Sequence, residues 1–115
     1  MKFENAGLEG LKADLQRLDE VMLELGLIRE ATWDYDRVTY DRKFDLKDGV
    51  FYLRVQGHAV EGDVGAHRAV IKLITPILGK YYFPHGVEYG DGEEFPNSLV
   101  SQSEKILAEI KAKLS

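Results

Sequence analysis

The strongest constraint on the fold is a short turn signal between two segments whose composition favours strands. Residues 32–44 and 50–55 are rich in aromatic and β-branched side chains, which suit a pleated, half-buried surface. Between them lie residues 45–49, and the Asp48-Gly49 pair supplies the positive φ that a tight hairpin needs. The sequence therefore predicts an antiparallel hairpin at the centre of the chain.

A helix is predicted before this hairpin, because apolar residues recur there every three or four positions, as on one stripe of a helix. The residues of this stripe are Leu8, Leu11, Leu15, Leu18, Met22 and Leu25. Gly26 follows directly and suits the left-handed position after a helix, so we expect the helix to end there. The repeat is too short for a coiled coil, so the stripe should pack on the protein's own sheet.

Three elements are predicted after the hairpin. Residues 68–75 alternate as a third strand that Pro76 should end or turn into an edge. Residues 80–89 read as a fourth strand or two short ones bent at residues 84–86, followed by a loop over 86–95. A closing helix begins at residues 96–98, with Asn97 or Ser98 as its cap. The glycine-containing residues 57–66 indicate a long loop or a bulged strand end.

These elements predict a single α+β domain over residues 1–115. It has two layers: a mainly antiparallel sheet of three to five strands, with an N-terminal and a C-terminal helix on one face. A chain of 115 residues, 44% apolar, can bury one core without disulfides or a structural metal. The chain has no cysteine, which excludes iron–sulfur clusters, thiolate zinc sites and thiol nucleophiles. With no bilayer-spanning apolar run and no signal-peptide pattern, we expect a cytosolic protein without membrane contacts.

The net charge of −5 disfavours nucleic acid and anionic membranes as partners. The sequence also lacks the Lys/Arg-Gly-Phe type of motif that RNA-binding sheets use, so no nucleic-acid partner is expected. The acidity lies in the predicted first helix and around residues 88–94, whereas residues 27–60 carry six basic and six acidic side chains. This neutral, Arg- and Tyr-bearing hairpin can hold a small anion.

A two-layer fold leaves one sheet face uncovered, and the alternation predicts what this face carries. If Phe51, Leu53 and Val55 face the helices, then Tyr52, Arg54 and Gln56 face outward. On the preceding strand one parity holds Trp33, Tyr35, Arg37 and Thr39, and the other holds Val38, Tyr40, Arg42 and Phe44. A bulge near Asp36 would reconcile the two by turning Trp33, Tyr35, Val38, Tyr40 and Phe44 toward the core.

The uncovered face is the first candidate binding surface, formed by Tyr52, Arg54, Lys72 and Arg37. A planar or anionic small ligand could stack on Tyr52 beside Arg54. The alternatives are a homodimer contact through this face and an ordinary half-solvated surface.

The second candidate is the aromatic and acidic segment 81–96, where His85 beside Glu88 or Asp91 could act as an acid–base pair. Its glycines and prolines could equally serve only to shape a turn. No nucleophile motif or phosphate loop is present, so no catalytic residue is assigned. The spacing of His58, His67 and His85 matches no compact ligand motif, so neither a metal nor a cofactor is expected.

Four strings in the chain, MKFEN at 1–5, WDYDRVTYD at 33–41, VEGDV at 60–64 and PHGVEYGD at 84–91, together resemble the YugN-like family of Bacillus-type bacteria. The resemblance implies a soluble cytoplasmic protein of a spore-forming bacterium, and no activity, cofactor or catalytic residue to carry over. The leading hypothesis is a small non-catalytic binding or interaction module that dimerises through its open sheet face. The alternative is a small-molecule ligand-binding protein or enzyme with its site near residues 85–91.

Overall fold

A long central hairpin organises the fold. In the computed structural model, which describes residues 1–31, 35–66, 68–90 and 92–115, β3 (Arg37–Leu46) and β4 (Gly49–Asp63) are its two strands. They pair in unbroken antiparallel register from Leu46 opposite Gly49 to Arg37 opposite His58. The predicted hairpin is confirmed, and Gly49 takes a φ of 136° directly after the two-residue turn.

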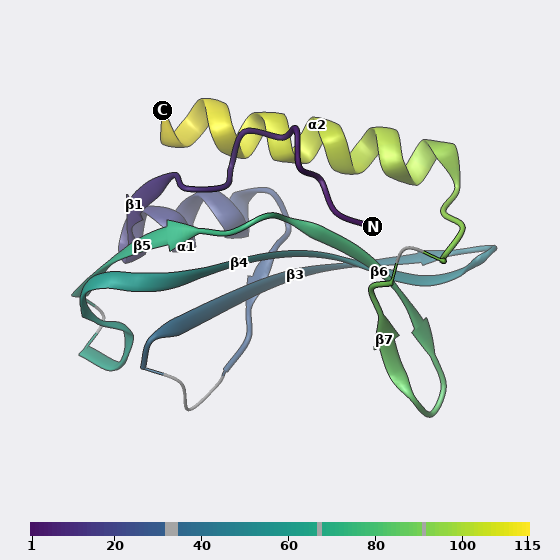
Figure 1. The fold of residues 1–115 in the computed structure, drawn as a ribbon, viewed down its shortest axis with the longest axis horizontal. Helices are drawn as coiled ribbons and strands as arrows, with labels where there is room; N and C mark the ends of the chain where they lie inside the picture. Colours follow the sequence, from purple (N-terminus) through teal and green to yellow (C-terminus); the bar gives the residue numbers. More distant parts are fainter. Residues whose placement is uncertain (32–34, 67, 91) are drawn as a thin grey trace.

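β4 is long enough to pair with two strands in succession on its other side. β5 (Arg68–Leu73) pairs with residues 57–63 of β4, and β6 (Ile77–Tyr82) with residues 51–54. Three short strands complete the sheet: β1 (Lys12–Asp14) beside β5, β2 (Ile28–Arg29) beside β3, and β7 (Gly86–Glu88) beside β6. Within the described residues the antiparallel sheet thus has seven strands, more than the three to five predicted (Figure 1).

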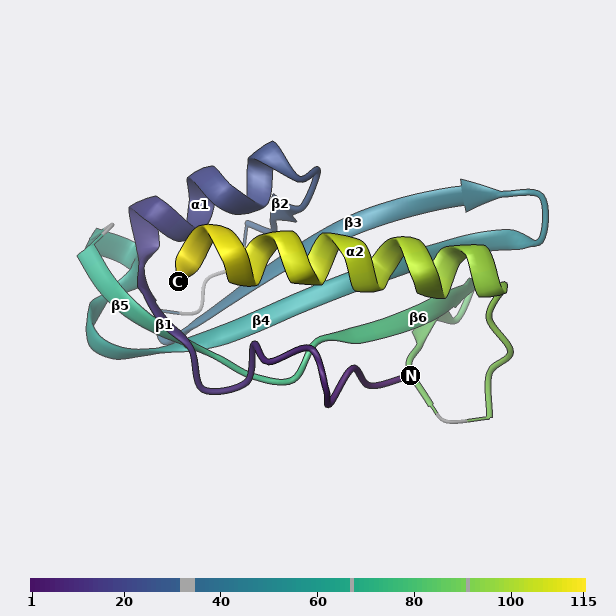
Figure 2. The same ribbon diagram turned by 90° about the horizontal axis from the view of Figure 1, so that it is seen from above.

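Both helices, α1 (Leu15–Glu24) and α2 (Asn97–Leu114), lie on the same side of the sheet (Figures 1 and 2). α1 is shorter than predicted, because Gly7 and Gly10 adopt φ of 77° and 87° and residues 12–14 pair with β5 instead. Leu8 is buried as the stripe predicted, but it packs from an irregular segment. At α2 the position before the helix is Pro96, and no side chain caps its N-terminus.

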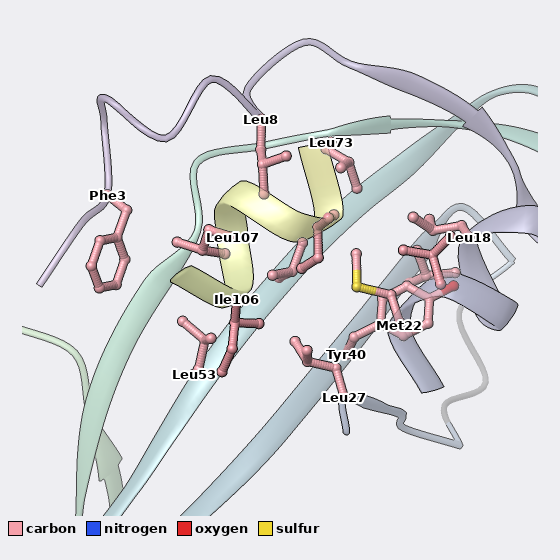
Figure 3. Packing of buried hydrophobic residues seen from close by; sticks show 14 of the residues in the cluster. Phe3, Leu8, Leu18, Met22, Leu27, Tyr40, Leu53, Leu73, Ile106 and Leu107 are labelled. Carbon is pink, nitrogen blue, oxygen red and sulfur yellow. The ribbon is translucent and has the colours of Figure 1, made fainter. Parts of the chain in front are cut away.

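The core lies between the helices and the sheet (Figure 3). Leucine and isoleucine side chains of α2 meet the stripe of α1 above the hairpin, and the N-terminal segment closes one end with Phe3 and Leu8. Fully buried members of this cluster include Leu18, Met22, Tyr40, Leu53, Leu73 and Leu107. The predicted stripe and strand alternation therefore converge on one apolar layer.

The alternation along β4 is as predicted, with Phe51, Leu53 and Val55 buried under the helices and the residues between them half-buried on the opposite side. On β3, Val38 and Tyr40 also face the helices. Tyr35 does not, since it is 60% exposed. It precedes β3 and lies beside the short 3-10 turn η1 (Val64–Ala66), close to Gly65, so no bulge carries it into the core. Trp33 lies outside the described residues.

Two of the irregular segments match their predictions. The register between β4 and β5 shifts between Ala59 and Glu61, so residues 57–63 form a bulged strand end. β6 and β7 are the predicted pair of short strands, joined by a turn at residues 83–85. Among the described parts of the chain, no helix is long and apolar enough to cross a membrane.

Candidate functional site

The candidate site lies on the side of the sheet away from the helices, which we call the outer face. Cross-strand register aligns four of its side chains side by side: Lys12 of β1, Lys72 of β5, His58 of β4 and Arg37 of β3. All four are exposed. None makes a hydrogen bond or ion pair with any residue that the structure describes. We call these four residues the basic row.

The basic row is unfavourable for the sheet by itself. Directly opposed side chains in an antiparallel pair stand about 5 Å apart, and like charges at such positions destabilise the sheet. Lys12 opposes Lys72, and Lys72 and Arg37 flank His58. A bound anion would relieve this repulsion, so the arrangement is typical of a place that receives negative charge.

A hollow of about 600 Å³ adjoins the basic row. It forms where the N-terminal segment leaves the sheet between Phe3, whose N–H donates to Pro76, and Gly10, whose N–H donates to Leu73. The hollow is lined by Lys2, Glu4, Glu9, Gln56, Ile74, Thr75 and Ile77. Gln56 precedes His58 by two positions on β4, so the hollow lies next to the row.

The other end of the outer face is occupied by an ion-pair network around Arg54. Its Nε and Nη2 donate to the two carboxylate oxygens of Asp41, each at 2.8 Å, and Nη2 also reaches Glu30 at 3.4 Å. The guanidinium carbon lies 5.1 Å from the centre of the Tyr89 ring. We call Glu30, Asp41, Arg54 and Tyr89 the arginine network. Because Nε and Nη2 of Arg54 already donate to the ionised carboxylate of Asp41, this guanidinium is not available to a ligand anion.

The network shifts the pKa values of its two acids in opposite directions. The pKa of Glu30 rises from 4.5 to about 7, chiefly because its protonated carboxyl hydrogen-bonds Asp41, with burial and the charge of Asp41 adding to the rise. Burial pushes the pKa of Asp41 upward, but hydrogen bonds from Arg54 and Glu30 outweigh it and hold that pKa below its usual value. The pair therefore shares one proton below about pH 7.

The Tyr89 ring of the arginine network packs against Gly79 of β6. A Cβ on Gly79 would lie 2.6 Å from ring atoms of Tyr89, so only glycine leaves room for the ring against β6. Burial raises the pKa of Tyr89 to about 12, and its hydroxyl is buried without a hydrogen-bond partner among the described residues. The tyrosine thus acts as a neutral cover over this end of the face.

The structure separates the site residues expected from the sequence. Arg37 and Lys72 lie in the basic row, and Arg54 lies in the arginine network. Tyr52 is on the outer face opposite Lys43. The face therefore carries two distinct polar regions instead of one site around Tyr52 and Arg54.

Of the second expected cluster the structure describes His85 and Glu88, and no hydrogen bond or ion pair joins these two side chains. His85 is exposed in the turn between β6 and β7, and it makes no hydrogen bond or ion pair with the described residues. Glu88 stands opposite Lys80 on the same hairpin, which projects away from the helices (Figure 1). Asp91 lies outside the described residues. Across the described segments no group of three or more His, Asp or Glu side chains is placed to hold a metal ion.

Sequence reasoning missed Lys12, His58, Glu30, Asp41 and Tyr89. The parity of His58 with Arg54 along one strand could have placed it on the outer face. The others depend on which strands are neighbours, and Lys12 fell inside a helical pattern.

Fold and site together define a class: two-layer α+β proteins with an antiparallel sheet, helices on one face and a polar, open second face. The particular family follows from comparison, since the sequence model of the YugN-like family matches residues 4–111. The chain belongs to this family, as its motifs had indicated.

Two relatives come from Bacillus subtilis (strain 168). The chain is 57% identical over 110 residues to uncharacterized protein YlbA, covering 96% of this chain and 92% of the relative. It is 31% identical over 108 residues to uncharacterized protein YugN, covering 91% and 81%. A crystal structure of the uncharacterized conserved protein YugN from Geobacillus kaustophilus HTA426 superposes with a TM-score of 0.87 at 57% identity, covering 99% of this chain and 94% of that one. None of these descriptions states an activity.

Proposed function

We propose that the protein is a small cytoplasmic, non-catalytic binding module whose outer face takes an organic anion. Its oxyanion groups would contact Lys72, His58 and Arg37, and its uncharged part would enter the adjoining hollow. The observation that carries this proposal is the basic row itself: four basic side chains, none of them paired with a residue that the structure describes, are held directly opposite one another in a chain of net charge −5.

The surroundings of the row favour a small ligand over a polymer. Four neighbouring strands at about 4.8 Å spacing make the row about 14 Å long. On one side Asp14 and Glu61 flank Val70 on the same face, and on the other Glu4 and Glu9 line the hollow. A polyanion continuing beyond the row would meet these carboxylates, whereas a compact ligand with one or two anionic groups would not.

The alternative, a catalytic or ligand site near residues 85–91, has less support. Its histidine lies in an exposed turn without a partner among the described residues, and the hollow beside the basic row lies elsewhere. The sequence offers no nucleophile motif to place there.

Thermal unfolding with inorganic phosphate, pyrophosphate and citrate tests the proposal. A ligand at 100 times its Kd adds about 2.7 kcal/mol, which raises the Tm of a domain of this size by about 10 °C. At least one of these anions should raise Tm, and Lys72→Ala or Arg37→Ala should remove most of the rise. The matched control, Lys105→Ala, changes an exposed lysine of α2 and should leave the rise intact.

Two results contradict the proposal. One is no rise in Tm with any of the three anions. The other is a rise of equal size in the wild type and in the Lys72→Ala variant, which would place the binding elsewhere. A rise that disappears equally in the Lys105→Ala control would indicate only a general screening of charge.

A further inference from the structure

Half of strand β3 presents an unpaired edge. Along one edge, β3 pairs with β4 at ten consecutive register positions without a bulge. Along the other edge, β2 pairs only with Tyr40 and Asp41, and the N–H of Glu30 donates to the carbonyl oxygen of Thr39. Within the described residues no strand lies beside residues 42–46, which form a free rim of the sheet (Figure 2). A regular, unpaired edge of this kind is a template for another strand.

The sequence along this edge is complementary to itself. In an antiparallel pair around a twofold axis at Phe44, each Lys43 stands opposite the partner's Asp45, and each Phe44 opposite its own copy. Lys43 and Asp45 are both exposed, and they share the outer face of the strand. Neither makes an ion pair with any described residue, so both charges are available to a partner.

On the face of the sheet that the helices cover, residues 42–46 add apolar contact to this charge pairing. Phe44 is 7% exposed under the guanidinium of Arg42, 5.0 Å from the ring centre. Leu46, at the end of the strand, is 36% exposed. In the paired arrangement it would stand beside the partner's Arg42 and Phe44, where the methylene groups of the arginine and the ring can cover it.

We propose that two copies of this chain join edge to edge through residues 42–46 of β3, antiparallel about a twofold axis at Phe44. The two Lys43–Asp45 pairs fix the register, because a shift of two residues would set Asp45 against Asp45. The sequence alone had suggested the outer face as the dimer contact. The edge is the better surface, because it offers opposite charges to a second copy, whereas the basic row of the outer face offers the like charges of Lys12, Lys72 and Arg37.

Charge reversal combined with sedimentation velocity tests this arrangement. The wild type should show a monomer–dimer equilibrium at high protein concentration that weakens with added salt. Lys43→Asp and Asp45→Lys should each raise the dimer Kd by about tenfold or more, because each places like charges opposite one another twice. The double variant Lys43→Asp/Asp45→Lys restores both pairs with reversed polarity and should recover the wild-type Kd within about threefold.

The control Lys105→Asp makes the same charge change on α2 and should leave the Kd unchanged. Circular dichroism of each variant checks that the monomer is folded, which is expected because both positions are exposed. A wild type that stays monomeric at millimolar concentration overturns the proposal. A dimer that withstands both single reversals, or that the double variant fails to restore, also overturns it and places the contact on another surface.

Discussion

Because Glu30 and Asp41 share a proton in the arginine network, we predict that Glu30→Gln changes the free energy of unfolding in a pH-dependent way. Glutamine has the shape of the protonated acid and can still donate to Asp41, but it does not ionise. The wild-type pKa rises from 4.5 to about 7 on folding. A raised pKa stabilises the folded state fully below pH 4.5, and this contribution declines as the pH rises toward 7. Above about pH 7 the wild type must carry the ionised, destabilised carboxylate.

The expected magnitude follows from the shift and from the exposure of the side chain. A shift of this size corresponds to about 3.4 kcal/mol if fully expressed. The Glu30 side chain is 45% exposed, so solvent screens most of this energy, and about 1 kcal/mol is expected. Glu30→Gln should therefore equal the wild type near pH 4.5, gain stability progressively up to pH 7, and remain about 1 kcal/mol more stable above it.

Urea unfolding at a series of pH values measures this difference directly. All other titrating groups are common to both proteins and cancel when the two free energies of unfolding are subtracted. Glu94→Gln, at an exposed position whose side chain makes no hydrogen bond or ion pair with a described residue, is the matched control and should give a flat difference. A flat difference for Glu30→Gln, or a loss of stability above pH 7, would refute the shared-proton account.

Three further substitutions, the first of them with a control variant, test the fold. Gly62→Ala should destabilise the protein by about 2 kcal/mol or more in urea unfolding, because Gly62 has a φ of 77° and a Cβ there would lie 2.1 Å from a backbone oxygen. The control Gly90→Ala should be within about 0.5 kcal/mol of the wild type, since a Cβ at Gly90 would meet nothing within 4 Å. Leu53→Ala removes a fully buried side chain and should cost about 2–5 kcal/mol in the same assay. Arg54→Ala leaves the carboxylate of Asp41, which is only 10% exposed, without its cation, so the free energy of unfolding should fall by about 2 kcal/mol near pH 7. This loss should shrink in acid, because the carboxylate then takes up a proton.

Local signals in the sequence were enough to predict the centre of the fold. The turn before Gly49 and the alternation of Phe51, Leu53 and Val55 depend only on neighbouring residues, and both are confirmed. The first helix was predicted too long because Leu8 and Leu11 continue the apolar stripe. What ends the pattern is the pairing of residues 12–14 with β5, about 60 residues further along the chain, and no local signal reports it.

The site was harder to predict for the same reason. The sequence placed Arg54 on the open face but could not show that Asp41, 13 residues away, and Glu30, 24 residues away, accept hydrogen bonds from it there. The basic row depends on register between four strands, and Lys12 enters it through an unforeseen strand. Charges were visible in the sequence, but their alignment is a property of the assembled sheet.

Binding of an anion at the basic row is the central claim, and a two-dimensional NMR titration with pyrophosphate tests it most directly. The expected result is saturable, salt-sensitive shifts of the backbone amides of Lys12, His58 and Lys72, with those of α2 unmoved. Arg37 should respond with them, since it ends the row on β3. Shifts confined to the hairpin turn at residues 83–85, or none up to millimolar ligand, would contradict the account.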